Sequence, residues 1–300
     1  MHSLGLSNAR LSVQILPQAG AGIARFDWLG RGEPIPLMRP YRQPLAASDT
    51  PLDSNQLACY PLVPWSNRIA EGGFTMAGRR ISLSPNRDDE AFPIHGSGWQ
   101  RIWQLLRHSE DEMLLALNEA TADAYAYRAT LRYVLRDDAL HVELQVTNTA
   151  STVMPFGLGM HPFFPRHGEV RLRAPAPKVW LNNGQTPLPI ALAEVPPAWD
   201  FHHGKGLPDE EIDHCFRPWT GDALISWPRE RLHLQVEADV DVFVLYTPLD
   251  QDFFCFEPVD HAINAVHLPG GAVGNGMTLL EPEASLTRRF VFRPIDDDQA

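Results

Sequence analysis

An alternation of apolar and polar residues with a period of two constrains the fold of this chain more than any other feature. It is clearest in four segments, which are residues 11–15, 127–135, 140–146 and 232–236. Successive side chains of a β-strand point to opposite faces, so each segment predicts a strand with one face in a core and one in polar surroundings. The continuous apolar run 242–246 predicts a strand buried on both faces, and 290–292 predicts a last strand.

The rest of the chain agrees with an all-β fold. We find no apolar stripe at helical spacing, and 27 prolines and 21 glycines interrupt the sequence throughout, as short strands and long loops require. The 300 residues are 44% hydrophobic, which is enough for a large core. We therefore expect a single all-β domain over residues 1–300, with two large antiparallel sheets packed face to face.

The composition limits the partners and the location of the protein. A net charge of −12 repels nucleic acids and anionic membranes, so we expect neither as a partner. Residues 1–10 do not read as a secretory signal, and no apolar stretch approaches the roughly 18 residues of a membrane helix, which predicts a cytoplasmic protein. Cys59, Cys215 and Cys255 are widely spaced, which predicts reduced thiols rather than disulfides or a CxxC metal site.

Two predicted loops carry polar residues that suit a sugar. Arg68 follows Asn67 and lies near Trp65 in the sequence. A guanidinium can form paired hydrogen bonds to hydroxyl groups while an indole packs on a pyranose face. His95 lies in a glycine-rich turn, where functional residues often occur. Each residue also has a purely structural explanation. Arg68 could be a surface arginine packed over an aromatic ring, and His95 could be a histidine whose hydrogen bonds are made by the backbone.

Three further polar residues lie in apolar surroundings. Aromatic residues follow His161 closely, and they would desolvate its imidazole and lower its pKa. Glu257 ends a run of aromatic residues and cysteine, where burial would raise its pKa and make it a stronger base near neutral pH. Asp213 lies among apolar residues, where an unpaired carboxylate is costly. The structural alternatives are a histidine at the edge of the core for His161, a buried ion pair for Glu257 and an aspartate that caps a turn for Asp213.

Together these residues suit proton transfer on a neutral polyol. We find no nucleophile elbow, phosphate-binding loop or dinucleotide fingerprint, so we predict a reaction without cofactor or metal. Spacing alone leaves open whether the residues converge in space.

The same segments, in the same order, resemble the aldose 1-epimerase (galactose mutarotase-like) family from about residue 9 to residue 292. The matching pieces are Asn67-Arg68-Ile69 with Gly72-Gly73-Phe74, His95-Gly96 with Trp99, Gly159-Met160-His161-Pro162-Phe163-Phe164, Ile212-Asp213-His214-Cys215-Phe216 and Phe256-Glu257-Pro258. The resemblance implies a β-supersandwich, in agreement with the alternating pattern. It also implies an enzyme that interconverts the α and β anomers of a hexose by acid–base ring opening and reclosure.

The resemblance further implies residue roles. Glu257 matches the catalytic base and His161 the catalytic acid, with His95 close to the reacting centre. The implied substrate-binding residues are Arg68, Asp213, Asn67 and Trp99. One departure lies at Pro282-Glu283-Ala284, where the family usually has Pro-Gly-Glu.

Three alternatives remain open from the sequence. A hexose-6-phosphate 1-epimerase would need cations at the phosphate, for which Arg79, Arg80 and Arg87 are candidates. A zinc or iron enzyme could use His95, His161 and Glu257 as ligands. A sugar-binding module would bind one anomer without converting it. The preferred aldose and the choice between monomer and homodimer are left open as well.

Overall fold

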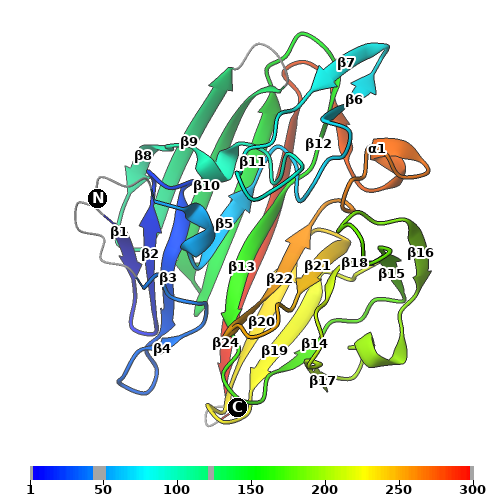
Figure 1. The fold of residues 1–300 in the computed structure, drawn as a ribbon. Helices are drawn as coiled ribbons and strands as arrows, with labels where there is room; N and C mark the ends of the chain where they lie inside the picture. Colours follow the sequence, from blue (N-terminus) through cyan, green and yellow to red (C-terminus); the bar gives the residue numbers. More distant parts are fainter. Residues whose placement is uncertain (1–2, 43–51, 121–124, 298–300) are drawn as a thin grey trace.

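The computed structural model describes residues 3–42, 52–120 and 125–297, and in these ranges the chain is built almost entirely from β-strands (Figure 1). The predicted all-β class is therefore confirmed. Every pairing between neighbouring strands of these ranges is antiparallel. None of the helices there has the length and apolar character that a membrane span requires.

Two large sheets form the body of the protein. In spatial order, the first contains β1 (Leu4–Ser7), β2 (Leu11–Leu16), β3 (Gly22–Trp28), β5 (Cys59–Leu62), β13 (Gly159–Pro165), β22 (Phe253–Val259), β21 (Val242–Tyr246), β18 (Asp213–Arg217), β15 (Lys178–Leu181) and β16 (Ala191–Glu194), with β4 (Ile35–Pro36) beside β3. The second contains β17 (Lys205–Gly206), β14 (Arg171–Arg173), β19 (Asp222–Trp227), β20 (Leu232–Ala238), β24 (Ser285–Asp296), β11 (Ala139–Asn148), β10 (Ala126–Arg136), β9 (Glu112–Ala120) and β8 (Gln104–His108).

Smaller elements cover the ends of the sheets. Two short pairs are β12 (Met154–Phe156) with β23 (Thr278–Leu280), and β6 (Gly73–Met76) with β7 (Arg79–Ser82). The helical turns are α1 (Gly271–Gly274), η1 (Ser54–Gln56), η2 (Gly98–Gln100) and η3 (Pro197–Trp199). All four are only three or four residues long, which is too short to produce an apolar stripe at helical spacing, so the absence of such a stripe from the sequence is explained.

The strands predicted from the alternating pattern are confirmed. The four alternating segments lie in β2, β10, β11 and β20, and residues 290–292 lie within β24. The apolar run 242–246 is β21, whose first four residues are buried. Periodicity located these strands because each buries one face of alternating side chains, which leaves a direct imprint on the sequence.

The two sheets pack face to face through their aromatic residues. Phe254 and Phe256 of β22 belong to the same buried cluster as Phe290 and Phe292 of β24. Burying each of these side chains contributes about 2–3 kcal/mol relative to exposure. Because side chains alternate along a strand, the residues between Phe254 and Phe256 in β22 must face the other way.

That opposite face of the first sheet carries a second, smaller cluster. It includes Tyr60, Phe163, Val244 and Cys255, one from each of β5, β13, β21 and β22. The central strands of this sheet are thus buried on both faces. A polar residue on the second face is held rigidly by strands whose other side is anchored in the main core.

A buried ion pair joins the two sheets at the end of β22. Asp260 is 3% exposed and accepts hydrogen bonds from the Leu158 amide at 2.8 Å and from Arg288 Nε of β24 at 2.5 Å. Burial raises the pKa of Asp260 to about 6, against the opposing charge of Arg288.

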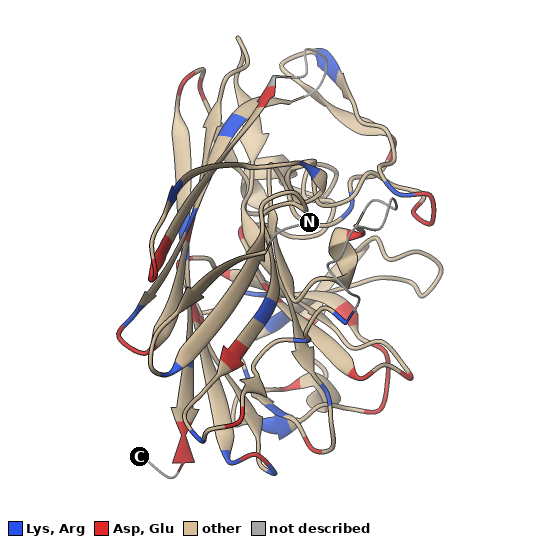
Figure 2. Cartoon of the chain, turned by 90° about the vertical axis from the view of Figure 1, so that its left-hand side faces the viewer, with Lys and Arg blue, Asp and Glu red and all other residues tan. Residues whose placement is uncertain are grey.

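Other charged residues are scattered over strands and loops with both signs interspersed (Figure 2), such as the exposed pair of Glu143 and Arg289.

We expect Asp260→Ala to lower the free energy of unfolding by about 3 kcal/mol. The substitution leaves a guanidinium and a buried amide without their acceptor. The matched control is Glu143→Ala, which breaks an exposed pair on the second sheet and should cost less than about 1 kcal/mol. Urea denaturation at neutral pH measures both. Equal losses in the two variants would contradict a special role for the buried pair.

Candidate active site

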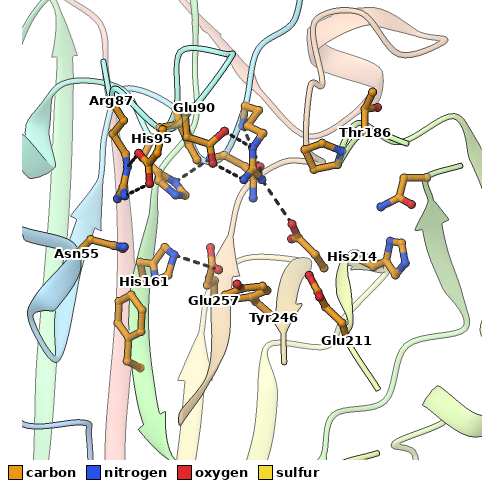
Figure 3. A pocket seen from close by; sticks show the side chains of 18 of the residues that line it. Asn55, Arg87, Glu90, His95, His161, Thr186, Glu211, His214, Tyr246 and Glu257 are labelled. Carbon is orange, nitrogen blue, oxygen red and sulfur yellow. Dashed lines mark hydrogen bonds and ion pairs between the residues drawn. The ribbon is translucent and has the colours of Figure 1, made fainter. Parts of the chain in front are cut away.

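A pocket of about 700 Å³ lies on the second face of the first sheet, and the described residues that line it come from strands and loops (Figure 3). The central strands β5, β13, β22, β21 and β18 each contribute at least one side chain. The rest of the lining comes mainly from the loops 87–95 and 182–187. Rigid strands therefore carry one part of the pocket and loops the other.

Two strands bring His161 and Glu257 together. In the pairing of β13 with β22, Phe163 lies opposite Cys255 and Gly159 opposite Val259, so His161 falls opposite Glu257. His161 Nε2 is 3.3 Å from Glu257 Oε1, and the two residues are 6% and 2% exposed. Among the described residues, His161 Nδ1 and Glu257 Oε2 have no hydrogen-bond partner.

Burial determines the protonation of this pair. Loss of hydration lowers the pKa of His161 to about 3. The same cause raises the pKa of Glu257 well above its ordinary value, and Asp213 adds to this shift while Arg68 opposes it. Desolvation disfavours the charged form of both groups. Desolvation therefore favours a neutral imidazole beside a neutral carboxyl group.

Aromatic rings enclose the imidazole of His161. Tyr60 stacks on it with ring centroids 4.6 Å apart and an interplanar angle of 28°. Phe163 stacks on it at 4.6 Å and 23°. These rings replace water around the imidazole, which is the desolvation that the sequence pattern predicted.

His95 approaches His161 from a loop. Its Nδ1 accepts a hydrogen bond from the Asn67 amide at 3.0 Å, so the neutral ring carries its proton on Nε2. Burial, with positive charge nearby, keeps the pKa of His95 well below its ordinary value. The ring centroids of His95 and His161 are 5.0 Å apart. At Gly96, with φ of +65°, a Cβ would lie 2.4 Å from the Val63 carbonyl oxygen, so this turn requires glycine.

Arg68 is the centre of an ion cluster above the pair. Its Nε donates to Glu90 Oε2 at 3.0 Å, and its Nη1 lies 3.5 Å from Asp213 Oδ2 and 3.3 Å from Asn67 Oδ1. Burial raises the pKa of Asp213, while Arg68 opposes that shift. The cluster keeps several hydrogen-bonding groups in fixed positions along one wall of the pocket.

The structure brings six of the seven predicted site residues into one pocket: Asn67, Arg68, His95, His161, Asp213 and Glu257. The seventh, Trp99, does not line it. Trp99 is 1% exposed, stacks on Tyr60 at 5.1 Å and donates its indole N–H to the Gly96 carbonyl at 3.2 Å. An aromatic residue next to glycines gives the same sequence signal whether it contacts a sugar or supports another ring.

Several pocket residues had no distinguishing sequence signal. Asp89 and Glu90 resemble an ordinary charged surface loop, and Tyr60 resembles a core residue. Arg87 also lines the pocket, although from the sequence it was a candidate only for binding a phosphate. The divergent loop at Pro282-Glu283-Ala284 lies outside the pocket lining, between β23 and β24, where the Glu283 amide donates to the Asn148 carbonyl at 2.8 Å.

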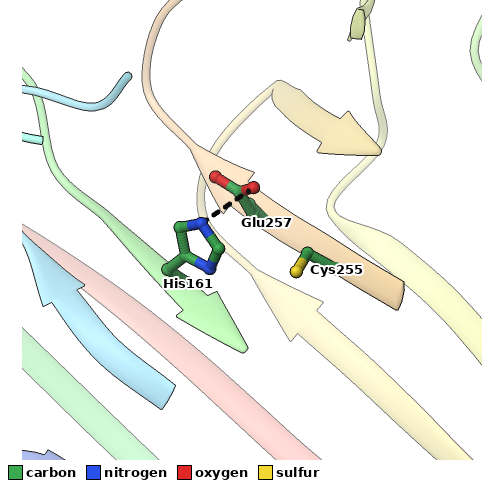
Figure 4. A group of neighbouring side chains, drawn as sticks. All are labelled: His161, Cys255 and Glu257. Carbon is green, nitrogen blue, oxygen red and sulfur yellow. Dashed lines mark ion pairs between the residues drawn. The ribbon is translucent and has the colours of Figure 1, made fainter. Parts of the chain in front are cut away.

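Cys255 lies beside the pair, on the same strand as Glu257 (Figure 4). His161, Cys255 and Glu257 each offer one atom, and these atoms lie within 4.8 Å of one another. Imidazole, thiolate and carboxylate are all zinc ligands. Burial, with the charge of Glu257, raises the pKa of the Cys255 thiol well above its ordinary value, so a metal ion bound here would have to displace the thiol proton. Cys59, Cys215 and Cys255 are free and buried.

The fold and the pocket define a β-supersandwich protein of the galactose mutarotase-like kind, with a buried imidazole–carboxyl pair. The family model for aldose 1-epimerase matches residues 2–293. An uncharacterized protein of Escherichia coli K12, YphB, is 32% identical over 297 residues, which cover 96% of this chain and 97% of YphB. The chain belongs to the aldose 1-epimerase family.

Solved structures agree with this assignment. A crystal structure from Escherichia coli K12, of a protein provisionally named an aldose 1-epimerase, is similar with a TM-score of 0.87 and 30% identity over 98% of this chain and 99% of that one. The GalM/aldose epimerase homologue from C. elegans is similar with a TM-score of 0.80 and 18% identity over 98% of this chain and 99% of that one. The second likeness supports the fold alone.

We expect Phe163→Leu to raise the pKa of His161 above its wild-type value of about 3. A smaller side chain lets water reach one face of the imidazole and reduces the cost of charging it. Histidine-detected NMR titration measures the change. The control is Phe164→Leu, because Phe164 is the next residue of β13 and faces the main core. An unchanged His161 in the first variant, or equal shifts in both, would contradict the role of the aromatic enclosure.

Proposed function

We propose that this protein is an aldose 1-epimerase that interconverts the α and β anomers of a free, neutral hexose. The observation that carries the proposal is the buried pair of His161 and Glu257, whose side chains lie 3.3 Å apart in the lining of a polar pocket. Burial leaves an unpartnered nitrogen and an unpartnered oxygen on this pair among the described residues. Such groups are costly for stability alone, and they are useful when a substrate completes their hydrogen bonds.

Ring opening uses the pair as acid and base. As the sugar enters, the shared proton passes to His161 Nε2, and Arg68 stabilises the carboxylate that remains on Glu257. Glu257 takes the proton of the anomeric hydroxyl while His161 protonates the ring oxygen, and the bond between C1 and that oxygen breaks. Rotation about the C1–C2 bond by roughly half a turn presents the other carbonyl face. Reclosure with the roles reversed gives the other anomer.

Other pocket residues hold the sugar in place for this exchange. His95 is neutral and carries its proton on Nε2, so it donates a hydrogen bond to an oxygen on which charge develops. Asp213, Arg68 and Asn67 bind ring hydroxyls. Because spontaneous mutarotation is already feasible, an acid and a base contributing about 10²–10⁴-fold each are sufficient without a metal or nucleotide.

The charges in the pocket favour a free sugar over a sugar phosphate. The two arginines of the lining are already paired, Arg68 with Glu90 and Asp213, and Arg87 with Asp89 at 2.7 and 2.6 Å. The other candidates for phosphate binding, Arg79 and Arg80, lie on β7 and outside the lining. A phosphate would meet more carboxylates than unpaired cations there. A non-catalytic sugar module would need no acid–base pair.

We expect the purified protein, after treatment with EDTA, to accelerate the approach of freshly dissolved α-glucose or α-galactose to anomeric equilibrium. Glu257→Gln and His161→Asn should each lower kcat by about 10²-fold or more. The double variant should be scarcely slower than either single variant, because the two groups act as one unit. Polarimetry measures the rates.

The matched control for these variants is Glu143→Gln, an exposed residue of the second sheet, which should keep the wild-type rate. Including hexose 6-phosphates in the panel tests the charge argument. Loss of activity on EDTA treatment would support the metal alternative. A rate equal to the spontaneous one for every free and phosphorylated aldose would remove the proposed function.

We expect kcat/KM, corrected for spontaneous mutarotation, to show a broad bell against pH. The active form holds one proton on the pair. A second proton binds only near the lowered pKa of His161, about 3, so activity persists well below pH 6.5. At high pH the pair loses its only proton, at a midpoint above the ordinary pKa of glutamate. These midpoints belong to the pair as a whole.

The variant Arg68→Met tests the alkaline side of this pH profile. The charge of Arg68 lowers the pKa of Glu257, so removing that charge should move the alkaline midpoint upward, in addition to raising KM. An acid midpoint near 6.5 in the wild type, or an alkaline midpoint that moves downward in the variant, would contradict the one-proton pair.

A further inference from the structure

Cys255 is a buried thiol beside the reacting pair, and the proposed mechanism gives it no role. It lies on β22 two residues before Glu257, so both side chains project from the same face of that strand, beside His161 of β13 (Figure 4). One ligand atom from each of the three residues lies within 4.8 Å of the other two. Among the described residues, no other group of three or more histidine, cysteine or carboxylate side chains comes so close together.

The spacing of the three ligand atoms suits a zinc ion. Three atoms no more than 4.8 Å apart always share a central point within about 2.8 Å of each, and zinc binds sulfur at about 2.3 Å and nitrogen or oxygen at about 2.0–2.2 Å. Each ligand atom therefore has to move inward by less than about 1 Å to reach bonding distance. Side-chain rotations of this size require no change in the pairing of β13 with β22.

Two of the three side chains carry polar atoms that no described residue satisfies. His161 Nδ1 and Glu257 Oε2 have no hydrogen-bond partner there, and their residues are only 6% and 2% exposed. Buried polar atoms of native proteins are almost always satisfied by a partner, which can be a bound ion. The unsatisfied atoms therefore point to a ligand at this place, independently of the spacing.

The charges of the site suit a divalent cation. A zinc ion removes the proton of a thiol that it binds. Held by the Cys255 thiolate, the Glu257 carboxylate and a neutral imidazole, it forms a complex without net charge, which avoids the cost of burying one. The described pocket lining also holds five carboxylates and two guanidinium groups, and this excess of negative charge attracts cations.

We propose that His161, Cys255 and Glu257 form an inhibitory zinc site whose fourth coordination position faces the pocket. Zinc bound there engages both groups to which ring opening is assigned, so neither can exchange a proton with a sugar. Imidazole and thiolate ligands favour zinc over magnesium, which prefers oxygen ligands. Zinc binding does not depend on the proposed function, whereas its effect on mutarotation rests on that function.

Cobalt absorption tests the site without a measurement of turnover. Co²⁺ binds in place of zinc at such sites, and a thiolate ligand gives it a charge-transfer band in the near ultraviolet. Protein treated with EDTA and then freed of the chelator should show this band when Co²⁺ is added, and Zn²⁺ should abolish it. Absence of the band from the wild-type protein would overturn the site.

Cysteine variants assign the band to one thiol. Cys255→Ala and the nearly isosteric Cys255→Ser should both lack it, with each fold verified by circular dichroism. The matched control is Cys215→Ala, which removes another fully buried thiol of the same sheet and should keep the band. A band that persists in both Cys255 variants, or that disappears in Cys215→Ala, would overturn the proposed ligand set.

Polarimetry measures the consequence for mutarotation. Zn²⁺ should slow the EDTA-treated enzyme by about tenfold or more, because it engages both acid and base, and renewed EDTA should restore the rate. Mg²⁺ at the same concentration should have no effect. In Cys255→Ala the zinc concentration for half-inhibition, relative to that variant's own metal-free rate, should rise by about tenfold or more, since loss of an outer-shell partner alone costs 10–100-fold in affinity. Cys215→Ala should match the wild type.

The two measurements separate the zinc site from the proposed function. Zinc that leaves an active enzyme unaffected, or that accelerates it, would overturn the inhibitory role. A cobalt band that depends on Cys255, in a protein that accelerates no sugar, would support the metal site and remove the proposed function.

Discussion

The antiparallel pairing of β13 with β22 is the constraint on which the rest of the site depends. Its register places His161 directly across from Glu257, on adjacent strands of one sheet. A shift of one residue would turn both side chains to the opposite face, because side chains alternate along a strand. Phe254 and Phe256 oppose such a shift, because both are buried in the main core and would lose that burial on the other face.

Burial then gives the pair its chemistry. In water an imidazole and a carboxyl group would both be partly charged near pH 5, but here Tyr60 and Phe163 stack on the imidazole of His161 and keep water away from it. Desolvation shifts the two pKa values in opposite directions, downward for His161 and upward for Glu257. The ion cluster of Arg68 moderates this effect, since its positive charge stabilises the carboxylate.

Strands and loops contribute different parts of the pocket lining. The strands hold His161 and Glu257, the proposed acid and base, and the opposite faces of these strands are fixed in the core. Proton transfer of the proposed kind requires accurate positioning of both groups. The loops 87–95 and 182–187 carry most of the remaining lining, and loops tolerate sequence variation better than the strands they connect.

The sequence by itself determined the all-β class, the position of strands such as β10 and β21, and the unusual surroundings of His161 and Glu257. Each of these leaves a local imprint, because burial of alternate residues selects apolar side chains at a period of two. Only the tertiary structure decided that Trp99 supports Tyr60 rather than lining the pocket, that Glu90 pairs with Arg68, and that residues 182–187 face the same space as Glu257. These relations join segments far apart in the chain, and no local pattern records them, because the free energy that selects them comes from contacts formed when the sheets pack.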